Sequence, residues 1–271
     1  MKKIKISYLG PKGSFSEIAA KKFLKNKDAE YVAERTIGEI FERVERGEVN
    51  FGIVPVENSF SGSVGITLDK FFSSKVKIFG EITIDVEYFL LSNKRMKEIK
   101  TIYSHPQAIP QCIEWINKNI KDAEIIETSS TSMAAKLAFE RGEAAIASKN
   151  AAKEYKIKVL RKIASSKTRF FIISMEDAKR GKGKKDKKSK TSVLFTVKHE
   201  PGSLVKALEA FRDYNINMTK IESRPIKGRL WEYAFFVDFE GHKDDKRVKE
   251  ALKKLREKTI QLKILGSYSI C

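Results

Sequence analysis

Apolar and polar positions in the first 175 residues change repeatedly between a two-residue period and a helical period, which predicts strands and helices in alternation. The first strand is expected over residues 4–9. A Gly-Pro-Lys-Gly turn follows it, and Ser14 and Glu17 can then form a capping box that opens a helix. Further strands are expected over residues 31–33, 51–56, 101–103, 123–127 and 144–147, each with a helix after it. This order predicts an α/β fold with mainly parallel sheets.

Residues 76–92 form a long, largely β-patterned stretch that separates two groups of polar loops. The loops are those between strands and helices, at residues 10–16, 57–63, 104–107 and 129–132. In open α/β sheets, ligands bind beyond the carboxyl ends of the strands, where helix N-termini present N–H groups. The pattern therefore predicts two lobes that face each other across a cleft, with a small, polar, anionic ligand between them.

The last part of the chain has a different pattern, with the order strand, helix, strand, strand, helix, strand. The strands are expected over residues 191–198, 217–224, 231–239 and 260–270, and the helices over 203–214 and 244–258. This order is the ferredoxin-like arrangement. Because such a sheet has exposed edges, we expect the domain to pair with a second copy of the chain.

A basic segment separates the two patterns. Residues 179–190 contain eight Lys or Arg and one Asp, a net charge of +7, and residues 182–190 include no apolar side chain. A segment of this composition cannot bury apolar surface and is expected to be a solvated linker. The sequence therefore predicts a first domain over residues 1–178, a linker over 179–190 and a second domain over 191–271.

Composition narrows the class of protein. The formal net charge is +19, but outside the linker the remaining +12 is mixed with many acidic residues. Aromatic residues are not interleaved with the basic run. Both observations argue against nucleic-acid binding as the main function. The two cysteines, Cys112 and Cys271, have no metal-ligand spacing and fit a reducing interior. With no apolar run long enough to cross a bilayer and no signal-peptide pattern at the start, we expect a cytoplasmic protein without a membrane partner.

Residues 165–174 combine polar chemistry with a buried strand. Thr168 and Arg169 precede a Phe-Phe-Ile-Ile run that is typical of a core strand. A hydroxyl can give a proton to a leaving oxygen, and a guanidinium can hold a carboxylate with two hydrogen bonds. Taken alone, this stretch is better explained as a surface Thr and Arg at a strand entrance. The polar loops earlier in the chain are what make it a candidate site.

Seven motifs stand in a fixed order along the chain. They are Gly-Pro-Lys-Gly-Ser-Phe-Ser at 10–16, Val-Pro-Val-Glu-Asn-Ser at 54–59, Ser-His-Pro-Gln-Ala at 104–108, Ser-Thr-Ser-Met-Ala-Ala at 130–135, Thr-Arg-Phe at 168–170, Pro-Gly-Ser-Leu-Val at 201–205 and Glu-Ser-Arg-Pro at 222–225. Together they resemble the prephenate dehydratase family, with its C-terminal ACT regulatory domain. The chain departs from the family pattern at Ser14, which replaces the usual Thr, at Ser166, which replaces an Asn, and at Ser203, which replaces an Ala.

The resemblance implies conversion of prephenate to phenylpyruvate, water and carbon dioxide on the route to phenylalanine, with feedback inhibition by phenylalanine. It also implies a catalytic domain folded like a two-lobed periplasmic binding protein and a homodimer or homotetramer. No cofactor or metal is implied, because aromatisation of the ring supplies the driving force. Arogenate as the substrate, and a non-catalytic phenylalanine sensor on the same scaffold, remain alternatives.

The resemblance also assigns residues. Thr168 is the catalytic candidate that assists the departing hydroxyl. The candidates for substrate binding are Asn58, Ser59, Ser104, Gln107, Ser130, Thr131 and Arg169. The candidates for phenylalanine binding are Gly202, Ser203, Leu204, Val205, Asn217, Glu222, Ser223, Arg224 and Pro225.

Some of these residues have a second interpretation. Arg169 could equally face a structural acid, and Ser130 and Thr131 could cap a helix while also binding a ligand. His105 is expected to fix its loop rather than act as a base, and Glu57 to organise the loop that contains Asn58.

Overall fold

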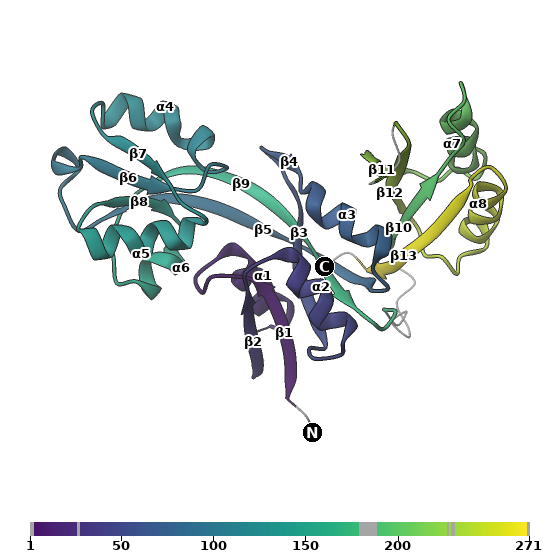
Figure 1. The fold of residues 1–271 in the computed structure, drawn as a ribbon, viewed down its shortest axis with the longest axis horizontal. Helices are drawn as coiled ribbons and strands as arrows, with labels where there is room; N and C mark the ends of the chain where they lie inside the picture. The colour runs from purple at the N-terminus through teal and green to yellow at the C-terminus, as the bar shows by residue number, and fades with distance from the viewer. Residues whose placement is uncertain (1–2, 26–27, 179–188, 227, 229–230, 270–271) are drawn as a thin grey trace. The chain divides into compact units, whose positions relative to one another are not determined.

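The computed structural model describes residues 3–25, 28–178, 189–226, 228 and 231–269 (Figure 1). Most of the predicted linker, 179–188, lies outside these residues. Contacts divide the chain into two compact units. The first comprises Met1–Ile40, Ile53–Val64 and Thr83–Phe170, and the second comprises Phe41–Gly52, Gly65–Ile82 and Phe171–Cys271. The second unit thus contains the whole predicted C-terminal domain together with segments that precede it.

The larger sheet has nine strands among the described residues, in the order β2-β1-β3-β9-β5-β8-β6-β7, with β4 paired to β3. Their bounds are β1 Ile4–Leu9, β2 Ala29–Glu34, β3 Phe51–Asn58, β4 Gly62–Ser63, β5 Lys77–Ser92, β6 Thr101–Ser104, β7 Glu124–Glu127, β8 Ala144–Ala147 and β9 Val159–Ser174. The pairs β1–β2, β6–β7 and β6–β8 are parallel, whereas β5–β8 and β3–β4 are antiparallel. The α/β class and the parallel pairing expected within each group of strands are confirmed.

Helices connect these strands at the expected places. They are α1 Phe15–Phe23, α2 Ile37–Glu45, α3 Gly65–Ser73, α4 Ile109–Asn119, α5 Thr131–Arg141 and α6 Lys149–Glu154. A short 3-10 helix, η1, spans Met96–Glu98. The cap predicted for α1 is confirmed in one half: Ser14 Oγ accepts a hydrogen bond from the N–H of Glu17. The return bond of a capping box is displaced by one residue, because the carboxylate of Glu17 accepts from the N–H of Gly13 at 2.6 Å, while the N–H of Ser14 donates to the carbonyl of Pro11.

The strands β6, β7 and β8 lie between helices, with α4 on one face and α5 with α6 on the other (Figure 1). The core on the α5 side consists of large residues of the sheet and small residues of the helix, such as Tyr103 and Leu91 against Ala134 and Ala138, all less than 4% exposed. Alanine side chains on α5 let the helix approach the sheet closely. Because α5 follows β7, the start of this helix lies beyond the carboxyl end of that strand.

The smaller sheet has the order β11-β12-β10-β13, and the pairs β10–β12, β10–β13 and β11–β12 are antiparallel. Its elements are β10 Ser189–Thr196, α7 Ser203–Asp213, β11 Met218–Pro225, β12 Tyr233–Glu240, α8 Lys246–Glu257 and β13 Gln261–Ser269. The predicted ferredoxin-like order is confirmed. Both helices pack on one face of the sheet, in a core that includes Phe195, Phe211, Phe239 and Leu255.

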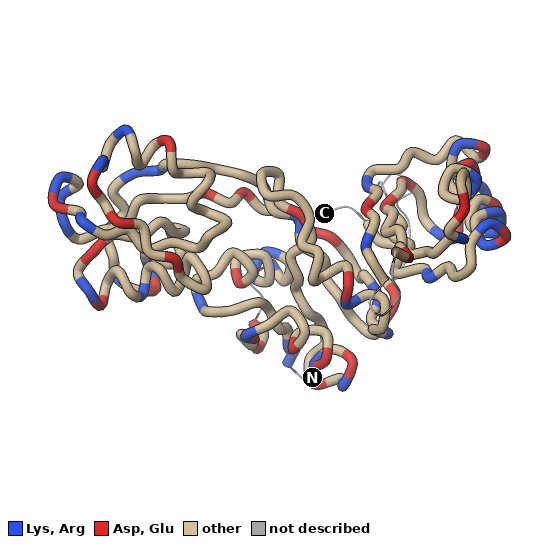
Figure 2. The backbone as a smooth tube through the Cα atoms, turned by 45° about the horizontal axis from the view of Figure 1, so that its top comes forward, with Lys and Arg blue, Asp and Glu red and all other residues tan. Residues whose placement is uncertain are grey.

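Charged side chains of both signs are interspersed along the described chain (Figure 2). Several pair across one helical turn, including Lys21 with Glu17, Arg46 with Glu42 and Lys136 with Glu140. Exposed pairs of this kind contribute little to stability but keep a surface solvated. No described helix is both long enough and apolar enough to cross a membrane.

Candidate active site

The side chain of Asn58 joins the end of strand β3 to strand β9 within the first unit. This residue ends β3, and its Nδ2 donates hydrogen bonds to Thr168 Oγ1 at 2.9 Å and to Ser166 Oγ at 3.1 Å on β9. Its Oδ1 accepts hydrogen bonds from the backbone N–H groups of Phe60 and Ser61 at 2.9 and 3.0 Å. Because the oxygen of the amide faces two N–H donors, the amide has one orientation, with its NH2 group directed at Thr168.

This orientation determines what the hydroxyl of Thr168 can do. Thr168 Oγ1 accepts from Asn58, so its own proton is available to another acceptor. Thr168 is buried, with 8% of its surface exposed. Water therefore competes little with a hydrogen bond that Thr168 donates. The contact with Asn58 uses one lone pair of Thr168 Oγ1 and leaves its proton for an acceptor elsewhere.

Ser59, which follows β3, also joins this end of the strand to β9. The N–H of Ser59 donates to the carbonyl of Lys167 at 2.8 Å, and the N–H of Lys167 donates to Ser59 Oγ at 2.9 Å. Ser59 Oγ thus serves as an acceptor for the backbone of β9 next to Thr168. Ser166, the residue that departs from the family pattern, accepts from Asn58 and so belongs to the same cluster.

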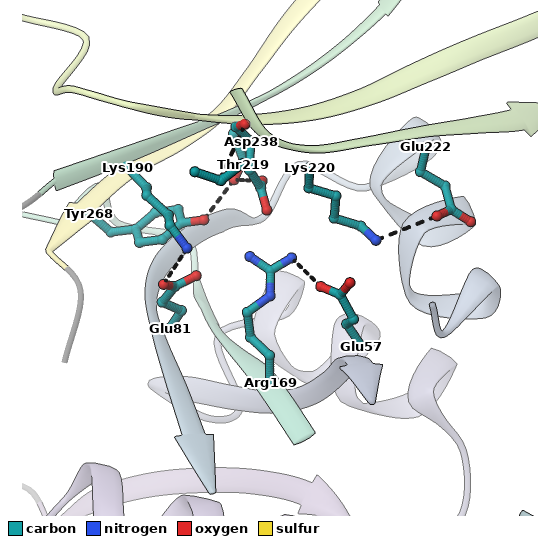
Figure 3. Close-up of polar contacts among 10 residues, drawn as sticks. Glu57, Glu81, Arg169, Lys190, Thr219, Lys220, Glu222, Asp238 and Tyr268 are labelled. Atoms are coloured by element: carbon teal, nitrogen blue, oxygen red, sulfur yellow. Dashed lines mark hydrogen bonds and ion pairs between the residues drawn. The ribbon is translucent and has the colours of Figure 1, made fainter. Parts of the chain in front are cut away.

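Arg169 and Glu57 form an ion pair next to this cluster, with Arg169 NH2 donating to Glu57 Oε2 at 3.0 Å (Figure 3). The side chain of Arg169 is 12% exposed and that of Glu57 is 40% exposed. The structural acid that the sequence left open for Arg169 is therefore present, and it is Glu57.

The candidates after β6 have separate partners. Ser104 is fully buried, and its hydroxyl donates to the carbonyl of Ile146 at 3.4 Å, which holds β6 against β8. Nδ1 of His105 accepts from the N–H of Gln107 at 3.2 Å, so His105 fixes its loop as predicted. Burial lowers the pKa of His105, an effect that nearby Glu127 opposes. The side chain of Gln107 is exposed.

The loop at residues 10–16 contacts the N-terminal ends of two helices in the same unit. Ser132 Oγ in the first turn of α5 donates to the carbonyl of Lys12 at 2.5 Å, and Ser148 Oγ donates to the carbonyl of Gly13 at 3.1 Å. Gly13 has a φ of +83°, and a Cβ there would come within 3.0 Å of Ser132 Oγ. The two groups of predicted loops therefore meet at this point.

Ser130 and Thr131 begin α5 beside this junction. Ser130 Oγ accepts from the N–H of Met133 at 3.0 Å, which is the predicted helix cap. Within the described residues, neither Ser130 nor Thr131 is hydrogen bonded to Asn58 or Thr168. Ser132, Ser148 and Ser166 were missed as site residues from the sequence, although the position of Ser148 before a helix was a usable signal.

Most of the candidates in the smaller sheet lie towards one of its ends, whereas Asn217 lies at the opposite end, where its carbonyl accepts from the N–H of Glu240 at 2.9 Å. Arg224 on β11 and Thr196 on β10 both lie opposite Ala234 on β12. The end of β11 and the loop that leads to Gly202 are therefore at the same end of the sheet. Gly202, with a φ of +80°, precedes α7, and Val205 in the first turn is 64% exposed.

The remaining effector candidates vary in their surroundings. Leu204 packs against the core of the smaller sheet, whereas Asn217, Ser223 and Pro225 are exposed and Ser203 is half-buried. Glu222 pairs with Lys220 at 3.4 Å (Figure 3). A cavity of about 350 Å³ opens at the same end of the sheet and was not anticipated. It is lined by Val197, Lys198, His199, Glu232, Tyr233, Phe235 and Ile260.

Among the described residues, no group of three or more His, Cys, Asp or Glu side chains is placed to hold a metal ion. The side chains at the Asn58–Thr168 cluster and beside it provide neutral hydroxyl and amide groups, a guanidinium and a carboxylate.

Two family models match the chain: one described as prephenate dehydratase over residues 6–178, and one described as ACT domain over residues 191–257. A bifunctional chorismate mutase/prephenate dehydratase of Aquifex aeolicus is 46% identical over 273 residues, which cover 98% of this chain and 74% of that protein. A prephenate dehydratase of Methanocaldococcus jannaschii is 39% identical over 277 residues, with 98% of each chain covered. A solved structure of prephenate dehydratase from Arthrobacter aurescens in complex with L-Phe superposes with a TM-score of 0.88 and 30% identity, over 98% of this chain and 90% of that one.

Proposed function

The chain belongs to the prephenate dehydratase family, and from this premise we propose that it converts prephenate to phenylpyruvate under feedback control by phenylalanine. The observation that carries the proposal is the Asn58–Thr168 hydrogen bond, which orients a hydroxyl donor in the part of the chain that matches the family.

The bonds that break in the reaction determine which groups the site must supply. Prephenate is a dianion that takes up one proton and yields phenylpyruvate, water and carbon dioxide. The bond between the ring and its hydroxyl oxygen breaks as that oxygen receives a proton. The electrons of the bond to the ring carboxylate enter the ring, which becomes aromatic, and the carboxylate leaves as carbon dioxide. The protein must place a donor at the leaving oxygen and hold both carboxylates in a reactive pose.

Thr168 serves as that donor in the proposal. A threonine hydroxyl is a poor acid in water, so its contribution is a hydrogen bond directed at the oxygen as negative charge develops there. The amide NH2 of Asn58 favours this direction, because it occupies a lone pair of Thr168 Oγ1 and leaves the proton for the substrate.

The other candidates orient the substrate. Arg169 supplies charge for one carboxylate, and the N-terminal end of α5 at Ser130 and Thr131 supplies N–H groups for the other. Gln107 offers an exposed neutral donor at the end of β6. Ser59 and Ser104 contact the backbone of neighbouring strands: Ser59 Oγ accepts from the N–H of Lys167 on β9, and Ser104 Oγ donates to the carbonyl of Ile146 on β8. In the proposal they position the strands that bear the other candidates.

Phenylalanine is the proposed effector. It is bound by the C-terminal domain at the end of the sheet that contains Gly202–Val205 and Glu222–Pro225. The exposed apolar side chain of Val205 supports this assignment, as does the L-Phe named in the complex of the Arthrobacter relative. We further propose that the catalytic domain spans 1–178, the linker 179–190 and the regulatory domain 191–271. The active form is proposed to be a cytoplasmic homodimer or homotetramer.

The decisive experiment is an assay of purified protein with prephenate, without added metal and with or without phenylalanine. We expect phenylpyruvate to form and phenylalanine to suppress its formation. Side-by-side rates with arogenate distinguish the nearest alternative substrate. Phenylalanine binding without turnover of either compound would instead identify a non-catalytic sensor.

A further inference from the structure

One peptide group in the loop after β1 is hydrogen bonded on both of its sides. The N–H of Gly13 donates to Glu17 Oε2 at 2.6 Å, and the carbonyl of Lys12, in the same peptide group, accepts from Ser132 Oγ at 2.5 Å. Glu17 lies on α1 and Ser132 lies in the first turn of α5, and both side chains are buried. A carboxylate at one end of such a chain polarises the peptide group and strengthens the bond at the other end.

The next carbonyl of the loop is bonded to a second helix of the same unit. Ser148 Oγ donates to the carbonyl of Gly13 at 3.1 Å and accepts from the N–H of Ala151, so one hydroxyl both caps α6 and binds the loop. Ser148 is 4% exposed and Ser132 is fully buried, so water competes little with either bond. We call these contacts of Lys12 and Gly13 with α5 and α6 the junction.

Two further contacts lie on the exposed side of the junction. Tyr155 OH donates to the carbonyl of Lys12 at 3.5 Å, and Lys12 Nζ lies 3.1 Å from Glu154 Oε1. The hydrogen bond is long and the lysine is exposed, so each contact contributes less than a buried serine bond. Ser132 and Ser148 are therefore the side chains whose removal tests the junction.

The junction connects two groups of loops that supply the proposed substrate contacts, all within the first unit. Residues 10–13 follow β1, which is a hydrogen-bonded neighbour of β3, the strand that Asn58 ends. The loop is fixed to its own group of strands, because the N–H of Gly10 donates to the carbonyl of Glu34 on β2 at 2.8 Å. Its other contacts reach the start of α5, which in the proposed function offers N–H groups to a substrate carboxylate.

We infer that Ser132 and Ser148 are positioning residues: by binding the carbonyls of Lys12 and Gly13 they hold the start of α5 where it can share a ligand with the loops after β1 and β3. The catalytic meaning of this inference rests on the proposed function, whereas the junction can be tested without substrate. With the junction intact, the two groups of loops are assembled before the substrate binds. Without it, only a fraction of the molecules is assembled, and the apparent affinity for substrate falls by that fraction.

Steady-state kinetics with prephenate test the positioning role. The net free energy of one hydrogen bond corresponds to a factor of roughly three to ten in an equilibrium constant. In Ser132→Ala we expect KM to rise about three- to tenfold while kcat stays within about twofold, because a molecule that has bound substrate is assembled as in the wild type. The double variant with Ser148→Ala should raise KM further. A merely structural role predicts a lower apparent kcat, from a smaller folded fraction, with KM unchanged.

Ser92→Ala is the matched control for Ser132→Ala. Ser92 is also fully buried, and its Oγ donates to the carbonyl of Glu143 at 3.1 Å, in a contact that does not involve residues 10–13. The control thus loses a hydroxyl–carbonyl bond of the same kind and leaves the junction intact. It should lower the free energy of unfolding by a similar amount and keep the wild-type KM. An equal rise of KM in the control would assign the effect to lost stability and overturn the inference.

Amide hydrogen exchange of the protein without substrate tests the junction independently of catalysis. Residues 10–16 and the first turn of α5 should exchange faster in Ser132→Ala than in the wild type or in Ser92→Ala. Unchanged exchange at these residues, or faster exchange without a rise in KM, would overturn the inference even if the wild type turns over prephenate normally. A wild type without turnover would overturn the proposed function instead, and the exchange rates would then decide whether the two serines hold the loop.

Discussion

The amide of Asn58 acts at the scale of single atoms, because its two halves have different partners. Its oxygen accepts from the N–H groups of Phe60 and Ser61, and its nitrogen donates to Thr168. A residue that kept the first set of contacts and lost the second would preserve the loop and disable the hydroxyl. Aspartate has this combination of properties, since an ionised carboxylate only accepts.

We therefore predict that Asn58→Asp lowers kcat by a factor of about 10² to 10⁴, the usual contribution of a positioned proton donor. The carboxylate attracts the proton of Thr168 and turns it away from the substrate. Kinetics with prephenate measure the loss, and thermal unfolding should show little change in stability. Thr168→Val is the companion variant, and Thr168→Ser should retain most activity. Near-normal turnover in Asn58→Asp would contradict the proposed role of the amide.

His105 gives the second prediction at this scale. Burial lowers its pKa, with Glu127 opposing, so the folded protein binds a proton at this site less tightly than the unfolded chain, whose value is about 6.5. Stability contributed by neutral His105 is thus complete above about pH 6.5 and is lost as pH falls towards the lowered pKa. His105→Asn keeps an acceptor for the N–H of Gln107 and should weaken this dependence. Urea unfolding at several pH values between about 5 and 8 compares the two proteins, and equal slopes would refute the prediction.

Sequence alone could name the partners of this site but not their contacts. Asn58 and Thr168 were identified through motifs that resemble a family, and Arg169 remained divided between a substrate and a structural acid. The hydrogen bonds from Asn58 to Thr168 and Ser166 join residues more than 100 positions apart, and no local pattern encodes such a pairing. The presence of Glu57 beside Arg169 likewise depends on the tertiary fold.

At the scale of elements, local signals predicted the starts of helices well because capping is a short-range interaction. Ser14 and Ser130 cap the helices for which they were proposed. The strand β9 was expected only in its second half, whereas it begins at Val159. Its first four residues are all exposed and alternate neither in polarity nor in burial, so they carry no strand signal of their own. Their strand conformation comes from pairing within the sheet.

Gly13 offers a prediction about the junction between the loop at 10–16 and helix α5. Its φ of +83° disfavours a side chain, and a Cβ would also press on Ser132 Oγ at 3.0 Å and Ala151 Cα at 3.2 Å. Gly47 has a similar φ of +68° but nothing within 4 Å of a Cβ, so Gly47→Ala carries only the conformational cost, about 1–2 kcal/mol. Gly13→Ala should lower the free energy of unfolding by more than this control does. Equal losses of the free energy of unfolding in the two variants, measured by urea unfolding, would show that the neighbours of Gly13 accommodate a Cβ without further cost.

At the scale of the whole molecule, the order of the two patterns along the chain was sufficient to predict the α/β class of the first part and the ferredoxin-like order of the second, whereas the family was predicted from the resemblance of seven motifs. The contacts of Arg224 were not predictable, because a basic residue at the end of a strand can serve a ligand or an ion pair equally well. Tertiary structure pairs it with Asp69, 155 residues away. Removing the C-terminal domain is for the same reason a poor test of regulation. Phe171 is fully buried and packs on Phe236 and Tyr268, so a truncated chain loses core packing as well as the effector site.

Point variants of the intact chain avoid this difficulty and separate the two proposed sites. We predict that phenylalanine raises the thermal unfolding temperature of the wild type and of Thr168→Val by the same amount, because a ligand that binds only the folded state stabilises it whether or not the enzyme is active. Val205→Asp should abolish the shift. Since Val205 is 64% exposed, this variant should fold normally and turn over prephenate without inhibition by phenylalanine. A full shift in Val205→Asp would place the effector away from the start of α7, whereas loss of the shift in Thr168→Val would mean that phenylalanine binds where the substrate does.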